Sequence, residues 1–184
     1  MKLRMLLRAA AIAMAVVGTT ATPRAEDAPP APSSTASYYL LQLVSPPKAV
    51  ISIAQGKIID GAFHADGTVF VNQTFKGTAT DGFVFAKAAP DTTQGIRVIR
   101  MSDSMFESVY VPCLSDFKTL AFDTQKGKVV YAGTVEYAYA ADGKIGASYG
   151  QDIEAARAFL KSHYPQLADE LTPGMTYQVS GSRC

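Results

Sequence analysis

The chain has 184 residues, with 17 Lys and Arg against 16 Asp and Glu, a formal net charge of +1 and no Trp. This length suits one domain with a sizeable core. The lack of a basic cluster argues against a nucleic-acid partner, because phosphate backbones bind concentrated Lys and Arg.

Residues 1–25 have the layout of a secretory signal peptide. Lys2, Arg4 and Arg8 form a positive start, residues 6–17 are apolar apart from Arg8, and small residues follow. Such a segment is too short to stay in a membrane and is removed during export. Removal would leave 13 basic and 16 acidic residues, a net charge of about −3. No second apolar run is long enough to span a bilayer, so we expect a periplasmic or secreted protein.

The sequence after the signal peptide divides into a linker and one domain. Residues 26–37 are rich in Pro, Ala and Ser and are expected to form a flexible linker. Residues 38–184 are expected to form a single domain, in which short β-prone runs alternate with turn residues. Strands are predicted at residues 38–44, 49–54, 57–60, 62–65, 68–71, 83–88, 95–101 and 108–112.

Asp-Gly pairs between β-prone runs predict tight hairpins. A two-residue type I′ turn needs positive φ angles at both central residues, which Asp and Gly tolerate. Such turns join antiparallel strands. The three pairs singled out on this ground are Asp66-Gly67, Asp81-Gly82 and Asp142-Gly143.

Residues 129–140 give the longest strand signal. Strict alternation would place Tyr131, Tyr137 and Tyr139 on one face, while Gly133 predicts a bulge or a close backbone approach. The tyrosine row has two interpretations: a platform on which a sugar or peptide stacks, or packing within the core. The strand is predicted to fold back at the last Asp-Gly pair into residues 144–148.

Residues 152–164 break the β pattern and predict one helix. Asp152 lies in its first turn and His163 in its last, which complements the helix dipole, and apolar residues recur along one stripe. Pro165 ends the helix or starts a short turn through Leu171, and a last strand follows around residues 175–179. The fold class expected from these elements is mainly β: an antiparallel β-sandwich with one C-terminal α-helix packed on or beside it.

Cys113 and Cys184 are the two cysteines. In an oxidising compartment we expect them to form a disulfide that pins the C-terminal end. An intermolecular bridge and a pair of buried free thiols stay open as alternatives. A redox-active pair is disfavoured because such cysteines usually lie close together in the sequence.

The segment Gly146-Ala147-Ser148-Tyr149-Gly150 matches the G-x-S-x-G pattern of serine hydrolases. In those enzymes the serine occupies a sharp turn between a strand and a helix, with an acid and a histidine downstream. His163 is the candidate base. However, a strand that follows a hairpin is antiparallel to its neighbour, so we interpret the match as coincidental. The two histidines are too few for a closed zinc site, and we expect no metal and no cofactor.

Three segments carry a family resemblance. They are the hairpin strand 82–87, the strand 127–135 with its Lys-Gly turn, and the helix 152–165, which starts with an acid and ends in Tyr-Pro. Together they resemble small bacterial envelope proteins with a transthyretin-like or prealbumin-like sandwich, many of them lipoproteins. This chain has no lipid-attachment Cys after its apolar run. The resemblance implies a β-sandwich of the envelope and supplies no catalytic residue.

These observations favour an exported, non-catalytic protein that binds an envelope protein or glycan. The alternative is a small periplasmic serine hydrolase that uses Ser148. A purely structural or stress-protective role is a third interpretation that the sequence does not separate from the first.

Overall fold

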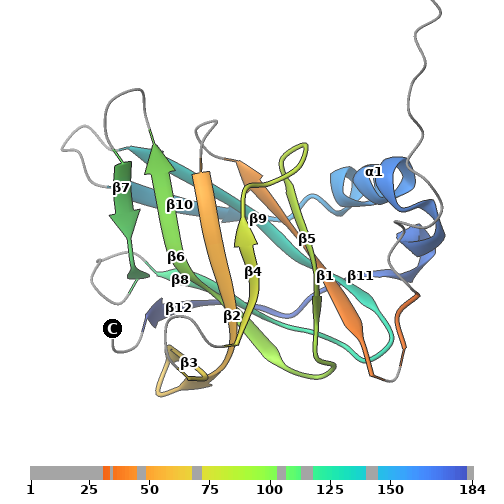
Figure 1. Ribbon diagram of the computed structural model, residues 1–184, viewed down its shortest axis with the longest axis horizontal. Coiled ribbons are helices and arrows are strands. Elements are labelled where there is room, and N and C mark those ends of the chain that lie inside the picture. Colours follow the sequence, from red (N-terminus) through yellow and green to blue (C-terminus); the bar gives the residue numbers. More distant parts are fainter. Residues whose placement is uncertain are drawn as a thin grey trace, which may run out of the picture.

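The computed structural model describes residues 31–33, 35–44, 49–67, 72–102, 107–112, 118–139 and 145–181, which form two β-sheets and a short helical region (Figure 1). The first sheet contains β1 (Ser37–Val44), β5 (Phe83–Ala88), β9 (Val129–Tyr139), β10 (Ile145–Gly150) and β11 (Leu171–Pro173). The second contains β2 (Ala49–Ile59), β3 (Ala62–Ala65), β4 (Gln73–Gly77), β6 (Thr93–Ser102), β7 (Glu107–Tyr110), β8 (Thr119–Asp123) and β12 (Thr176–Gly181). The helical region consists of α1 (Ile153–His163) and the 3-10 helix η3 (Pro165–Glu170).

The first sheet is built around β1 and β9. Its strand order is β10-β9-β1-β5, and β11 pairs with the start of β9. β5 and β10 run antiparallel to their neighbours, whereas β9 runs parallel to both β1 and β11. β1 is therefore paired on both sides, which buries it at the centre of the sheet.

Five strands of the second sheet close into a barrel. β2 pairs with β3 and β6, β3 with β12, β12 with β8, and β8 with β6. β4 and β7 are added outside this ring, on β2 and β6. Phe63 fills the interior, because a Cβ atom at Gly56 or Gly95 would lie 2.7 or 2.6 Å from its ring. Glycine at these two positions therefore makes room for the ring.

The first sheet is covered on both faces. On one face Leu41 and Val135 belong to a buried cluster with Ile51 of the barrel. On the other face Leu40 belongs to a buried cluster with Leu160 of α1. Figure 1 shows α1 at one end of the molecule, away from β3 and β7. The barrel, the first sheet and the helical region thus form successive layers.

The predicted helix 152–164 is present as α1, with the capping that its sequence indicates. The Asp152 carboxylate accepts a hydrogen bond of 3.0 Å from the Ala155 N–H, which satisfies one of the free donors of the first turn. The buried side chains of α1 are Ala156, Phe159 and Leu160. Their spacing places them on one face, so the helix covers the sheet with a single apolar stripe.

The Asp-Gly turns have mixed outcomes. At Asp81-Gly82 the φ angles are 48° and 79°, and Thr80 and Phe83 exchange two hydrogen bonds of 2.8 Å, which confirms the predicted tight turn. The predicted antiparallel pairing across this turn is wrong, because the preceding strand β4 belongs to the second sheet and β5 to the first. A further pair, Asp60-Gly61, joins β2 to β3 with φ angles of 51° and 75° and is absent from the sequence prediction. Asp142-Gly143 lies outside the described residues.

The mainly β class is confirmed, but the sandwich takes a different form from the prediction. The second sheet closes on itself instead of lying open, and three strand pairs are parallel. The separate strands predicted at 49–54 and 57–60 are one strand, β2. Ser37, assigned to the linker, is fully buried in β1, and its hydroxyl donates to the Gln125 carbonyl at 2.6 Å.

Candidate functional site

Ser148 is placed in a strand and not in a turn. The whole G-x-S-x-G segment lies in β10, where Ser148 pairs with Glu136 of β9 in an antiparallel ladder. Its hydroxyl donates to Glu136 Oε2 at 3.2 Å. A nucleophile elbow needs a sharp turn before a helix. The pattern therefore arises from an exposed edge strand with small residues, and the hydrolase interpretation loses its structural basis.

His163 has a different partner from Ser148. Its Nε2 lies 2.9 Å from Asp81 Oδ2 in the turn before β5, and its ring stacks on Phe159 of the same helix with centroids 4.4 Å apart. The Asp81 contact ties the last turn of α1 to the turn that precedes β5. A general base must lie within hydrogen-bond reach of its nucleophile, and His163 is instead held by Asp81.

The tyrosine row does not form an exposed platform. Gly133 has a φ of 98°. Tyr131 pairs with Leu40 of β1 and Thr134 pairs with Gln42, so β9 has one residue more than β1 between these two pairs. This bulge changes the face on which later side chains lie. Tyr131 packs under α1, whereas Tyr137 packs towards the barrel, and both are buried. The side chain of Tyr139 lies outside the described part of the chain.

Several predicted features fall outside the described residues. They are the signal peptide, half of the linker (residues 26–30 and 34), and both Cys113 and Cys184. Within the residues that the structure does describe, no group of three or more His, Cys, Asp or Glu is arranged to hold a metal ion.

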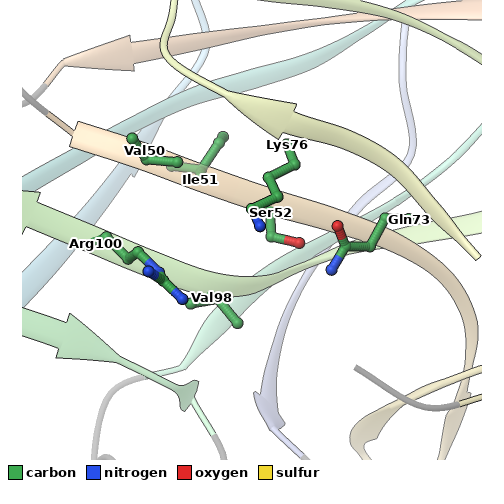
Figure 2. Close-up of a pocket in the computed structure, with 7 residues that line it drawn as sticks. All are labelled: Val50, Ile51, Ser52, Gln73, Lys76, Val98 and Arg100. Atoms are coloured by element: carbon green, nitrogen blue, oxygen red, sulfur yellow. The ribbon is translucent and has the colours of Figure 1, made fainter. Parts of the chain in front are cut away.

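A groove on one face of the second sheet is the candidate site. It lies across β4, β2 and β6, which are neighbours in that order, and has a cavity volume of about 40 Å³. We call it the cationic groove. Its lining consists of Val50, Ile51, Ser52, Gln73, Lys76, Val98 and Arg100 (Figure 2).

Ser52 lies in the middle strand of the cationic groove. It pairs with Lys76 on β4 and with Val98 on β6, so these side chains flank it on one face. Only 5% of Ser52 is exposed, and its hydroxyl has no hydrogen-bond partner among the described residues. Figure 2 shows the hydroxyl pointing to the side on which Gln73 lies. Most buried hydroxyls have a partner, so this one requires an explanation.

The charges in the cationic groove come from opposite sides. Lys76 is supplied by β4, while Arg100, opposite Val50 in the ladder, is supplied by β6. Among the described residues that line the groove, none is acidic. Gln73 and Arg100 already interact with other groups of the protein, so the groove offers a ligand chiefly the Lys76 ammonium and the Ser52 hydroxyl, two donors that suit a negatively charged acceptor.

A second buried polar cluster differs from Ser52 in being fully hydrogen-bonded. Gln94 is completely buried, and its Oε1 accepts from Thr74 Oγ1 at 2.9 Å while its Nε2 donates to Thr92 Oγ1 at 2.9 Å. The Tyr39 hydroxyl lies 3.1 Å from Thr74 Oγ1. Its polar atoms have protein partners, so this network is explained by packing between the two sheets alone.

The sequence prediction missed the cationic groove. Residues 73–77 have a polar, Gly-terminated sequence and no strand was predicted there, so Lys76 was not expected beside Ser52. Serine, lysine and arginine carry no motif at this spacing. An available signal was the single polar Ser52 within the apolar run of residues 49–54.

Comparisons with protein families, characterised proteins and solved structures found no match. The resemblance to transthyretin-like envelope proteins therefore stays a prediction from sequence motifs. Within the described ranges, no helix has the length and apolar character needed to cross a membrane.

Proposed function

We propose that this is an exported, non-catalytic protein that binds an acidic glycan of the cell envelope through the cationic groove. Export rests on the predicted signal peptide at residues 1–25. The observation that carries the binding proposal is Ser52, a buried hydroxyl without a protein partner among the described residues, placed between strands that supply Lys76 and Arg100. An acceptor group of a bound ligand would satisfy this hydroxyl.

The surface supports a glycan over a protein partner. Protein interfaces usually have an apolar core within a polar rim. The large exposed apolar side chains among the described residues come from separate parts of the chain, namely β1, β2, β7 and the segment before β12. They are Val44, Ile59, Val109 and Met175. A small groove with the Lys76 ammonium beside the Ser52 hydroxyl instead suits one charged unit of a polymer.

The contacts of the predicted catalytic residues support binding without catalysis. Ser148 donates to Glu136, and His163 pairs with Asp81. Nucleophilic catalysis requires a serine activated by an adjacent base. Ser148 lies next to an acid in an antiparallel strand pair, which supplies no such activation.

The test uses envelope polysaccharide separated by ion exchange into acidic and neutral fractions. We expect saturable binding of the purified protein to an acidic fraction, weaker at high salt because exposed charges are screened. Lys76→Gln should weaken this binding. Lys57→Gln should not, because Lys57 is an exposed residue of β2 that does not line the groove. The proposal would be overturned by binding to neither fraction, or by saturable capture of a protein that Lys76→Gln leaves unchanged.

A further inference from the structure

Met175 lies in the two-residue connection between β11 of the first sheet and β12 of the second. Its backbone is held on both sides. The Gly174 N–H donates to the Tyr131 carbonyl at 2.8 Å, and the Asp123 N–H donates to the Met175 carbonyl at 3.1 Å. The side chain nevertheless faces solvent, since 64% of Met175 is exposed, the largest fraction among the exposed large apolar residues of the described ranges. A held backbone thus presents a thioether to dissolved reagents.

Met101 offers an internal comparison. It lies in β6 and is completely buried in the cluster that packs between the two sheets. A thioether reacts only when an oxidant can reach its sulfur, so exposure decides which methionine is modified. We propose that Met175 is a site of reversible oxidation by peroxides, at which Tyr177 directs the incoming oxygen to one side of the sulfur.

The reaction is an oxygen transfer from the peroxide to the sulfur. A lone pair of Sδ attacks one oxygen of hydrogen peroxide, so that an S–O bond forms while the O–O bond breaks. The hydroxide that leaves takes the proton of the transferred oxygen and becomes water. The thioether is thereby oxidised by two electrons to a sulfoxide and the peroxide is reduced. A reductase returns the polar, chiral sulfoxide to methionine.

Tyr177 covers one side of the Met175 sulfur. Its hydroxyl oxygen lies 3.3 Å from Sδ and is itself held in place, because the hydroxyl donates to Asp123 Oδ2 at 2.7 Å. Thr93 Oγ1 donates to the other oxygen of that carboxylate at 2.7 Å, which fixes the acid as well. The hydroxyl of Tyr177 is therefore a fixed neighbour of the sulfur.

This contact predicts the stereochemistry of the product. A thioether sulfur has two lone pairs, and attack by one or the other gives two different sulfoxide epimers. Peroxide reaches the open side of Met175 and is kept from the side that Tyr177 occupies, so one epimer predominates. The new oxygen points to solvent and leaves the bond between Tyr177 and Asp123 intact.

The first experiment treats the purified protein with hydrogen peroxide and follows each methionine by peptide mass spectrometry. We expect Met175 to be oxidised at least about tenfold faster than Met101. Unfolding in urea should remove this difference, because both sulfurs then face solvent. Equal rates in the folded protein would overturn the site.

The second experiment identifies the epimer. The two classes of methionine sulfoxide reductase each reduce one epimer, and they are added separately to peptides from the oxidised protein. One class should restore most of Met175 and the other little. Tyr177→Phe keeps the ring and removes the hydroxyl, so each class should then restore about half. Tyr164→Phe, a tyrosine at the end of α1, is the matched control and should keep the bias.

Two results would contradict the role of Tyr177. They are equal restoration by both reductases in the wild-type protein, and a bias that survives Tyr177→Phe. If that variant does not fold, wild-type protein oxidised in urea supplies the unbiased reference, and a bias that persists there would also contradict the proposal. Met175 does not line the cationic groove, so neither experiment bears on glycan binding.

Discussion

Ser52→Ala tests whether the hydroxyl in the cationic groove lacks a protein partner. Ser52 is 5% exposed and its hydroxyl is unpaired among the described residues. An unsatisfied buried polar group destabilises the folded state by about 1–3 kcal/mol. Alanine removes the hydroxyl and keeps the Cβ atom, so nothing else in the barrel should change. We expect the free energy of unfolding to rise by about 1 kcal/mol, and the melting temperature by about 2–4 °C for a domain of this size.

Ser37→Ala is the matched control. Ser37 is also fully buried, but its hydroxyl donates to the Gln125 carbonyl at 2.6 Å. Its removal leaves that carbonyl without this partner, so stability should fall by about 1 kcal/mol. The two substitutions are chemically identical and differ only in the partner of the hydroxyl.

Urea unfolding followed by far-ultraviolet circular dichroism measures both free energies, since the chain has no Trp for fluorescence. Opposite signs for Ser52→Ala and Ser37→Ala support the account. A loss of stability in Ser52→Ala comparable to that in Ser37→Ala would mean that the hydroxyl already has a protein partner, and the argument for a ligand would fail.

Four further predictions follow from the fold. Gly95→Ala places a Cβ atom 2.6 Å from the Phe63 ring, so we expect the free energy of unfolding in urea to fall by about 1–3 kcal/mol. An unchanged urea midpoint would contradict the placement of the Phe63 ring inside the barrel. Burial raises the pKa of Tyr39 and Tyr137, and that of Tyr149 to about 12. The unfolded chain loses these protons near pH 10 and the folded chain keeps them, so stability should be unaffected up to about pH 10 and fall at higher pH. Urea midpoints that stay flat between pH 10 and 12 would contradict this. A fluorophosphonate probe should label neither the wild-type protein nor Ser148→Ala; labelling lost specifically in Ser148→Ala would restore the hydrolase. Finally, mass spectrometry without reductant should find Cys113 bonded to Cys184. An oxidising compartment favours this bond, and two free thiols would exclude it.

Local signals in the sequence predicted the local structure well. Asp and Gly tolerate positive φ angles, so the tight turn at Asp81-Gly82 follows from two residues. The helix α1 follows from its Asp152 cap and its apolar stripe. Each of these features depends on residues a few positions apart, which a single sequence displays directly.

Long-range pairing could not be predicted in the same way. Closure of the barrel depends on β12 meeting both β3 and β8, and no local pattern specifies such partners. The bulge was predicted from Gly133, but its effect was not: one extra residue moves Tyr137 to the opposite face from Tyr131. A prediction based on strict alternation therefore fails after any bulge.

The candidate site was hidden for the same reason. Ser52, Lys76 and Arg100 lie on three strands that become neighbours only when β2 pairs with β4 and β6 at once. The catalytic motif at Ser148 was visible in the sequence, yet its residues lie in a regular edge strand. A short motif is informative only when its backbone context is also present.

The binding surface can be mapped most directly by backbone amide NMR of the isotope-labelled protein during titration with an acidic polysaccharide fraction. The account predicts that chemical-shift changes gather at residues 50–52, 73–76 and 98–100, the three strand segments of the cationic groove. Chemical-shift changes confined to β9 and β10, with no change in the signals of the groove residues, would contradict the account.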